Sequence, residues 1–162
     1  MRVMILVAWL LGGCEAAETA PGGDTSATAG ATGTVTLGID GGVVFGTGTA
    51  MAKGHDLKAD LMAYKSGTGL DLKAGIPQGS TSRRPLHVLK TPGGTDATFA
   101  SLAEVPVELP SESEANAYAH KVKAGMGIVL RNNVSEGHTV VWVEAAGGSP
   151  ATVTLQYRVI LE

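Results

Sequence analysis

Residues 138–160, HTVVWVEAAGGSPATVTLQYRVI, decide the fold of this protein. In the second half of this stretch, apolar side chains recur at every other position, as in a strand with one buried face: Val153, Leu155, Tyr157 and Val159. Residues 147–150 (GGSP) form a turn sequence, because glycine adopts the backbone angles of tight turns and proline cannot donate to a strand ladder. The stretch therefore predicts two antiparallel strands, 138–145 and 151–160, joined as a hairpin.

Upstream of this hairpin, shorter alternating runs are separated by turns that contain Gly and Pro. The predicted strands are 35–39 and 43–45, joined as a hairpin by Asp40-Gly41-Gly42, then 57–63 and 70–73 as a second hairpin, 85–89, an edge strand within 99–107, and 127–131. Their spacing of about ten residues favours an antiparallel β-sandwich, or a partly open barrel, of about seven to nine short strands.

Residues 111–120 (SESEANAYAH) have the only helix-like composition in the chain. Ser111 is followed by Glu114 three residues later, which is the capping-box spacing at the start of a helix. The stretch allows only a turn or two. The prediction is therefore an all-β fold with at most one short helix.

The N-terminus has the features of an export signal. An apolar run, Val3–Leu11, follows Arg2. About nine residues are too few to cross a hydrocarbon core roughly 30 Å thick, but they suit the hydrophobic region of a signal peptide. Residues 15–33 are then Ala, Thr and Gly with almost no large apolar side chain, which is typical of a flexible tether.

Leu11-Gly12-Gly13-Cys14 resembles the lipobox of bacterial lipoprotein precursors, and Cys14 is the only cysteine in the chain. The resemblance implies cleavage between Gly13 and Cys14, a diacylglycerol thioether on the Cys14 sulfur, and a stable lipid anchor. It also implies a location in the bacterial cell envelope, on the outer membrane in a Gram-negative host, because Glu15 rather than Asp follows the cysteine. The expected organisation is a signal peptide (1–13), a lipidated cysteine with its tether (14–33) and a single β domain (34–162).

Residues 132–160 also resemble the closing hairpin of uncharacterised bacterial surface lipoproteins, a likeness that implies no activity.

Composition excludes one class of partner. The net charge is -3, and the basic residues are scattered, with Arg83-Arg84 as the only adjacent pair. A nucleic-acid-binding protein concentrates Lys and Arg on one surface. Nucleic acid is therefore not an expected partner, whereas the membrane, an envelope protein or a glycan is.

The sequence contains no recognised catalytic motif. The chain has no nucleotide-binding P-loop, no G-x-S-x-G and no H-E-x-x-H, and no cofactor is expected. His55, Asp56 and Asp60 form the densest group of metal-ligand side chains, but Asp60 shares a strand face with Asp56 and not with His55. We interpret the group as a solvated turn and strand face rather than a metal site.

Two aromatic residues are candidate ligand contacts, Trp142 and Tyr64. Trp142 shares a strand face with Val140, and a large aromatic on a central strand is usually core. The leading hypothesis is a non-enzymatic, lipid-anchored interaction or structural module of the envelope. A carbohydrate- or small-ligand-binding module requires Trp142 or Tyr64 to be exposed beside other aromatics, and a hydrolase requires His and Asp or Glu to converge in a pocket.

Overall fold

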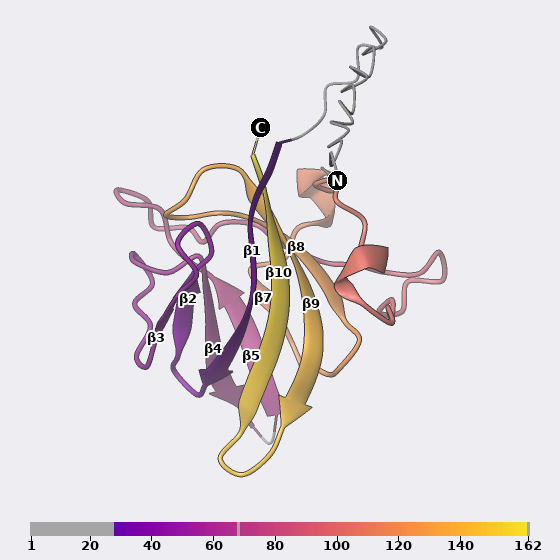
Figure 1. Cartoon of the computed structure of the whole chain (residues 1–162), viewed down its shortest axis with the longest axis horizontal. Helices are drawn as coiled ribbons and strands as arrows, with labels where there is room; N and C mark the ends of the chain where they lie inside the picture. Colours follow the sequence, from indigo (N-terminus) through magenta and orange to yellow (C-terminus); the bar gives the residue numbers. More distant parts are fainter. Residues whose placement is uncertain (1–27, 68, 162) are drawn as a thin grey trace, which may run out of the picture.

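The computed structural model describes residues 28–67 and 69–161, so Gly13 and Cys14 lie outside the described residues. In the described part, ten strands form two five-stranded antiparallel sheets, and β1, β10 and β9 cross in front of β4 and β5 (Figure 1). Sheet A has the order β1-β10-β9-β8-β6, and sheet B has the order β3-β2-β4-β5-β7. The predicted antiparallel β-sandwich is confirmed, with ten strands where about seven to nine were expected. The strands are β1 (Thr28–Gly38), β2 (Gly42–Val44), β3 (Thr49–Met51), β4 (Leu61–Ser66), β5 (Gly69–Ala74), β6 (Leu86–Val88), β7 (Tyr118–Ala119), β8 (Gly127–Arg131), β9 (His138–Gly147) and β10 (Thr152–Leu161).

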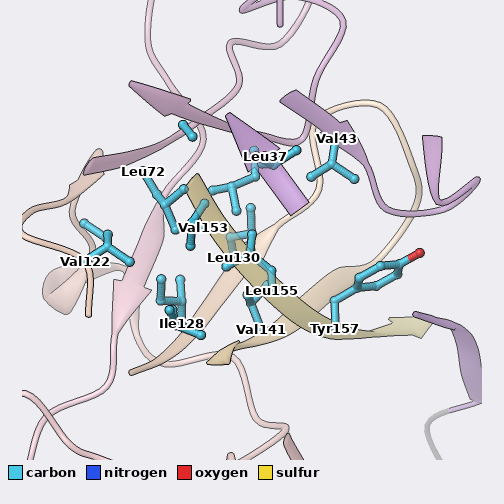
Figure 2. Packing of buried hydrophobic residues seen from close by; sticks show 14 of the residues in the cluster. Leu37, Val43, Leu72, Val122, Ile128, Leu130, Val141, Val153, Leu155 and Tyr157 are labelled. Atoms are coloured by element: carbon cyan, nitrogen blue, oxygen red, sulfur yellow. The ribbon is translucent and has the colours of Figure 1, made fainter. Parts of the chain in front are cut away.

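The predicted C-terminal hairpin is present as β9 and β10, which pair from Thr152 opposite Gly147 to Ile160 opposite His138. The alternating apolar residues of β10 point into the space between the sheets, where they meet side chains of both sheets (Figure 2). This core is nearly closed to solvent. Its largest fully buried side chains include Leu37, Phe45, Leu61, Leu72, Ile128, Leu130 and Leu155.

A second apolar cluster lies on the outer face of sheet A. Val129, Val140 and Ile160 are buried there, and Phe99 and Trp142 pack against them. This cluster explains why β8 and β9 carry apolar residues on both faces. A strand with only one buried face would alternate between apolar and polar residues.

The covering segment was predicted to be an edge strand within 99–107, and that prediction is wrong. The segment contains a 3-10 helix, Leu102–Glu104. Its apolar residues Phe99, Leu102 and Val105 follow a period of three, which suits a 3-10 turn and not a strand. These side chains pack on the outer face of sheet A, with Val105 buried and Phe99 and Leu102 partly buried.

The first predicted hairpin is also wrong, because its two strands belong to different sheets. β1 pairs with β10, whereas β2 pairs with β3 and β4. The Asp40 amide, at φ 65, donates to the Ala63 carbonyl oxygen on β4 at 2.9 Å. The turn therefore carries the chain across the sandwich instead of folding it back within one sheet.

β1 begins at Thr28, so the sheet includes residues 28–33 that the sequence assigned to the tether. Small residues suit this position physically. A Cβ atom on Gly33 would lie 2.7 Å from the Tyr157 hydroxyl, and one on Gly30 would lie 3.1 Å from Cβ of Val159, so a larger residue would have to displace these side chains of β10. The two glycines therefore allow β1 to pack closely on β10.

The middle of the chain is partly as predicted. The β4–β5 hairpin is confirmed, with Tyr64 opposite Asp71, although β4 starts at Leu61 rather than at residue 57. The helix-like stretch 111–120 forms a 3-10 turn, Glu112–Glu114, followed by strand β7, and Ser111 makes no side-chain cap hydrogen bond. Across the described residues, no helix is long and apolar enough to cross a membrane.

Candidate functional site

The two predicted ligand contacts have different surroundings. Trp142 is half-buried in the second apolar cluster, and its Nε1–H donates to the Phe99 carbonyl oxygen at 3.0 Å. Tyr64 is half-buried on the outer face of sheet B, where it lies beside other aromatic rings. Neither residue is exposed as the binding-module hypothesis required: Tyr64 lies half-buried beside other aromatic rings outside the core, and Trp142 is half-buried in the second apolar cluster.

The neighbours of Tyr64 come from β7 and the residue after it. The ring centroids of Tyr64 and Tyr118 are 5.9 Å apart in an edge-on arrangement, and those of Tyr118 and His120 are 5.7 Å apart with planes inclined by only 20°. Tyr118 and His120 share a face because they are two positions apart on an extended chain. We call Tyr64, Tyr118, His120 and the charged groups around them the Tyr118 face.

One end of the Tyr118 face is closed by an ionic cluster around Asp56. Arg83 donates to both carboxylate oxygens, at 2.8 and 3.1 Å, and the Lys73 ammonium lies 3.2 Å from one of them. The hydrogen bond from Arg83, supported by Lys73, lowers the pKa of Asp56 to about 2 against the effect of its burial. Arg83 also donates from Nε to the Tyr118 hydroxyl at 3.3 Å and lies over its ring. The cluster therefore holds the Tyr118 ring in place.

The other end is organised by Asp71, which is only 1% exposed. Burial alone would raise the pKa of Asp71, but hydrogen bonds from His120, the Lys121 amide and Ser66 hold it below its ordinary value. Asp71 Oδ2 lies 2.7 Å from Nδ1 of His120, and Oδ1 accepts from the Lys121 amide at 2.7 Å. Because an ionised carboxylate can only accept, Nδ1 of His120 carries a proton, and Nε2 is the ring nitrogen left to face a ligand.

Tyr64 lies opposite Asp71 on β4 and is affected by the same carboxylate. Burial, together with the negative charge of Asp71, raises the pKa of Tyr64 to about 12. The neutral phenol is therefore the form that the fold stabilises. This contribution to stability is fully present below the ordinary tyrosine pKa of about 10 and is lost as the pH rises through about 12.

We expect an ultraviolet titration of the phenolate band to contain a component with a midpoint near 12, which Tyr64→Phe removes. Asp71→Asn should move this component to lower pH, because it takes away the nearby negative charge. A titration curve that Tyr64→Phe leaves unchanged above pH 11 would contradict this description of Tyr64.

Beside the Tyr118 face, two adjoining cavities form what we call the β6–β7 groove. Their volumes are about 610 and 250 Å3, and both are lined by Val88, Lys90 and Asn116. The backbone of Asn116 pairs with Leu86, so the segment leading into β7 joins the edge of sheet A before it joins sheet B. The larger cavity follows residues 87–94, and the smaller one is lined by Asp96, Tyr118 and His120.

The group His55, Asp56 and Asp60 is not a solvated face, and that interpretation is wrong for Asp60. Asp60 is 0% exposed and accepts four hydrogen bonds, from Phe45, Asn133, Val134 and Ser135. His55 is exposed and accepts locally from the amide of Leu57 at Nδ1, while Asp56 is paired with Arg83. Among residues 28–67 and 69–161 there is no group of three or more His, Cys, Asp or Glu placed to hold a metal ion.

Sequence reasoning missed Tyr118, His120 and Asp71. The only local signal was the spacing of Tyr118 and His120 at positions i and i+2, inside a stretch with helix-like composition. Their partners come from β4, β5 and the region around residue 83. Chemically, the arrangement combines flat aromatic surfaces with a hydrogen-bonding ring nitrogen of fixed orientation at His120.

Comparisons with known proteins identify no relative of this chain. No protein-family model matches the chain, and no curated protein and no solved structure is significantly similar to it.

Proposed function

We propose that this protein is an exported bacterial lipoprotein, anchored in the envelope membrane through Cys14, whose β-sandwich binds an envelope partner at the Tyr118 face. The observation that carries the binding role is the exposure of rings outside the core. Tyr118 is 37% exposed and the His120 side chain 65% exposed, in a chain with only 4% aromatic residues. Rigid, partly exposed aromatics and paired Arg residues are the groups that most often anchor contacts.

The anchoring part rests on the lipobox resemblance of residues 11–14. The described strands begin at Thr28, whose strand pairs with the C-terminal strand β10 at Leu161. The segment from Cys14 would therefore join the domain at the end of sheet A where Thr28 lies opposite Leu161. In a Gram-negative host the outer membrane is the proposed destination.

Anchoring is tested by the mass of the mature N-terminus. We expect an acylated chain beginning at Cys14 that fractionates with membranes, and a Cys14→Ser variant that keeps its signal or is released without lipid. An unmodified chain that begins elsewhere would contradict the anchor.

The binding role is tested in cells with a photo-crosslinking amino acid at position 118 or at position 36. Thr36 is the matched control, because it is exposed on β1 of the other sheet. We expect a product at position 118 that depends on Cys14, and none at position 36. Equal products at both positions would contradict a specific contact surface.

One observation favours a second candidate, a hydrolase. The Asp71–His120 pair orients a histidine beside the smaller cavity, and this is the arrangement of a general base with its orienting carboxylate. Cleavage of a bound ligand, abolished by His120→Gln, would favour a hydrolase over a binding module.

A further inference from the structure

We propose that the β6–β7 groove binds a neutral oligosaccharide, with Tyr118 and His120 as its stacking surface. This inference rests on the proposed binding role and names the ligand class for the same site. Three independent features of the described residues support it: the shape of the groove, the arrangement of the rings and the pairing of the charges.

The shape of the groove suits a short chain of linked units. The larger cavity, of about 610 Å3, falls within the range of about 300–1,000 Å3 of small-ligand sites. The second cavity, of about 250 Å3, continues it past Val88, Lys90 and Asn116 to the aromatic pair. A compact single ligand would occupy one cavity, whereas an oligosaccharide can place successive sugar rings in both.

Exposed ring surface lies where the groove meets sheet B. Tyr118 and His120 are stacked on each other with their planes inclined by 20°, and Tyr118 remains 37% exposed and the His120 side chain 65% exposed. A pyranose ring has one face made of C–H groups, and the negative face of an aromatic ring attracts C–H hydrogens. Arg83 holds Tyr118 through its hydroxyl, and Asp71 holds His120 through Nδ1. Little side-chain freedom remains to be lost when a sugar stacks on them, which favours binding.

The charges around the groove are already paired, which favours a neutral ligand. Lys90 forms an ion pair with Asp96, and Asp56 is neutralised by Arg83 and Lys73. A polyanion or a basic peptide would gain less here than at an unpaired charge, because each of these groups already has a partner of opposite sign. A sugar hydroxyl both donates and accepts, so it can accept from the Lys90 ammonium and form a hydrogen bond in either direction with Nε2 of His120, without displacing Asp96 or Asp71.

The test uses the mature full-length protein in detergent micelles and three neutral probes, namely cellohexaose, maltohexaose and chitohexaose. We expect at least one hexasaccharide to bind and to shift the NMR signals of the Tyr118 and His120 rings. Tyr118→Ala should weaken this binding about tenfold or more, because truncating a central aromatic anchor typically has effects of this size. Ile39→Ala is the matched control and should keep the affinity within about threefold, since Ile39 is also 37% exposed but does not line the groove.

The outcomes separate this inference from the proposed function. If none of the three hexasaccharides binds at millimolar concentration, or if Tyr118→Ala binds as well as the original protein, the saccharide assignment is overturned. A protein crosslinked specifically at position 118 would then still support the binding role. If Tyr118→Ala does not fold, the NMR signal changes that a hexasaccharide causes in the unmodified protein test the site instead. Changes confined to the Tyr118 and His120 rings support the proposed site. Changes found only elsewhere would overturn it.

Discussion

Replacing Asp60 with asparagine is expected to lower the free energy of unfolding by roughly 2–4 kcal/mol, because a buried donor left without an acceptor costs about 1–3 kcal/mol and hydrogen bonds to a charged acceptor are lost as well. The carboxylate is fully buried and accepts four hydrogen bonds, two on each oxygen. Oδ1 accepts from the amides of Asn133 and Val134, and Oδ2 from the Phe45 amide and the Ser135 hydroxyl. Asparagine keeps the shape but has only one acceptor oxygen.

In either orientation, the new asparagine side chain places its NH2 group against buried hydrogen-bond donors. With Nδ2 in place of Oδ1, two backbone amides face it. With Nδ2 in place of Oδ2, the Ser135 hydroxyl can turn and accept, but the Phe45 amide stays unsatisfied. Because Phe45 follows β2 of sheet B and residues 133–135 connect β8 and β9 of sheet A, the loss loosens the two sheets from each other.

Urea unfolding of Asp60→Asn, with Asp40→Asn as the control, tests this. Asp40 is exposed at φ 65, a conformation that asparagine tolerates as well as aspartate, so the control should change stability by less than about 0.5 kcal/mol. Equal stabilities of the two variants would show that Asp60 does not hold the sheets together.

The second large effect is expected at Gly137, which lies between β8 and β9 at φ 78. A Cβ atom there would lie 2.0 Å from the Ile160 carbonyl oxygen and 3.1 Å from its carbonyl carbon. Both atoms belong to the backbone of β10, so the clash cannot be relieved by turning a side chain. Gly137→Ala should therefore cost roughly 3 kcal/mol or more, from the positive φ and the displaced strand together.

Gly79→Ala is the matched control, because Gly79 has φ 80 and no atom within 4 Å of its added Cβ. It should cost only the conformational penalty of about 1 kcal/mol. The difference between the two variants in thermal or urea unfolding measures the steric part. If both variants lose the same stability, β10 is not packed against Gly137 as described.

The C-terminal hairpin shows what could be predicted. β10 alternates with period two, β9 is an apolar run of strand length, and Gly147-Gly148-Ser149-Pro150 separates the two strands. All of this information is local, so the sequence alone was enough. The same holds for the β4–β5 hairpin and for the antiparallel sandwich as a class.

The failures share a physical cause, which is that the deciding contact comes from a distant part of the chain. The stretch 35–45 has the pattern of a hairpin, yet β1 pairs with a strand more than one hundred residues later. The lipobox at Cys14 lies outside the described residues and stays a prediction.

The candidate site depends even more on distant contacts. Asp71 and His120 are 49 residues apart, and Asp56 and Arg83 are 27 residues apart. Nothing near Asp71 in the sequence indicates that it is buried or that a histidine covers it. Local patterns reveal only which face of a strand a residue occupies.

The sequence by itself determined the all-β class, the C-terminal hairpin and the alternation that separates buried from outward positions, because these follow from the geometry of a single strand and its turn. Only the tertiary structure decided that Asp60 is a buried link between the sheets, and that Tyr64, Tyr118 and His120 meet beside a groove. The physical reason is that burial and hydrogen-bond pairing depend on which strands become neighbours, and that choice is made by the packing of the whole core.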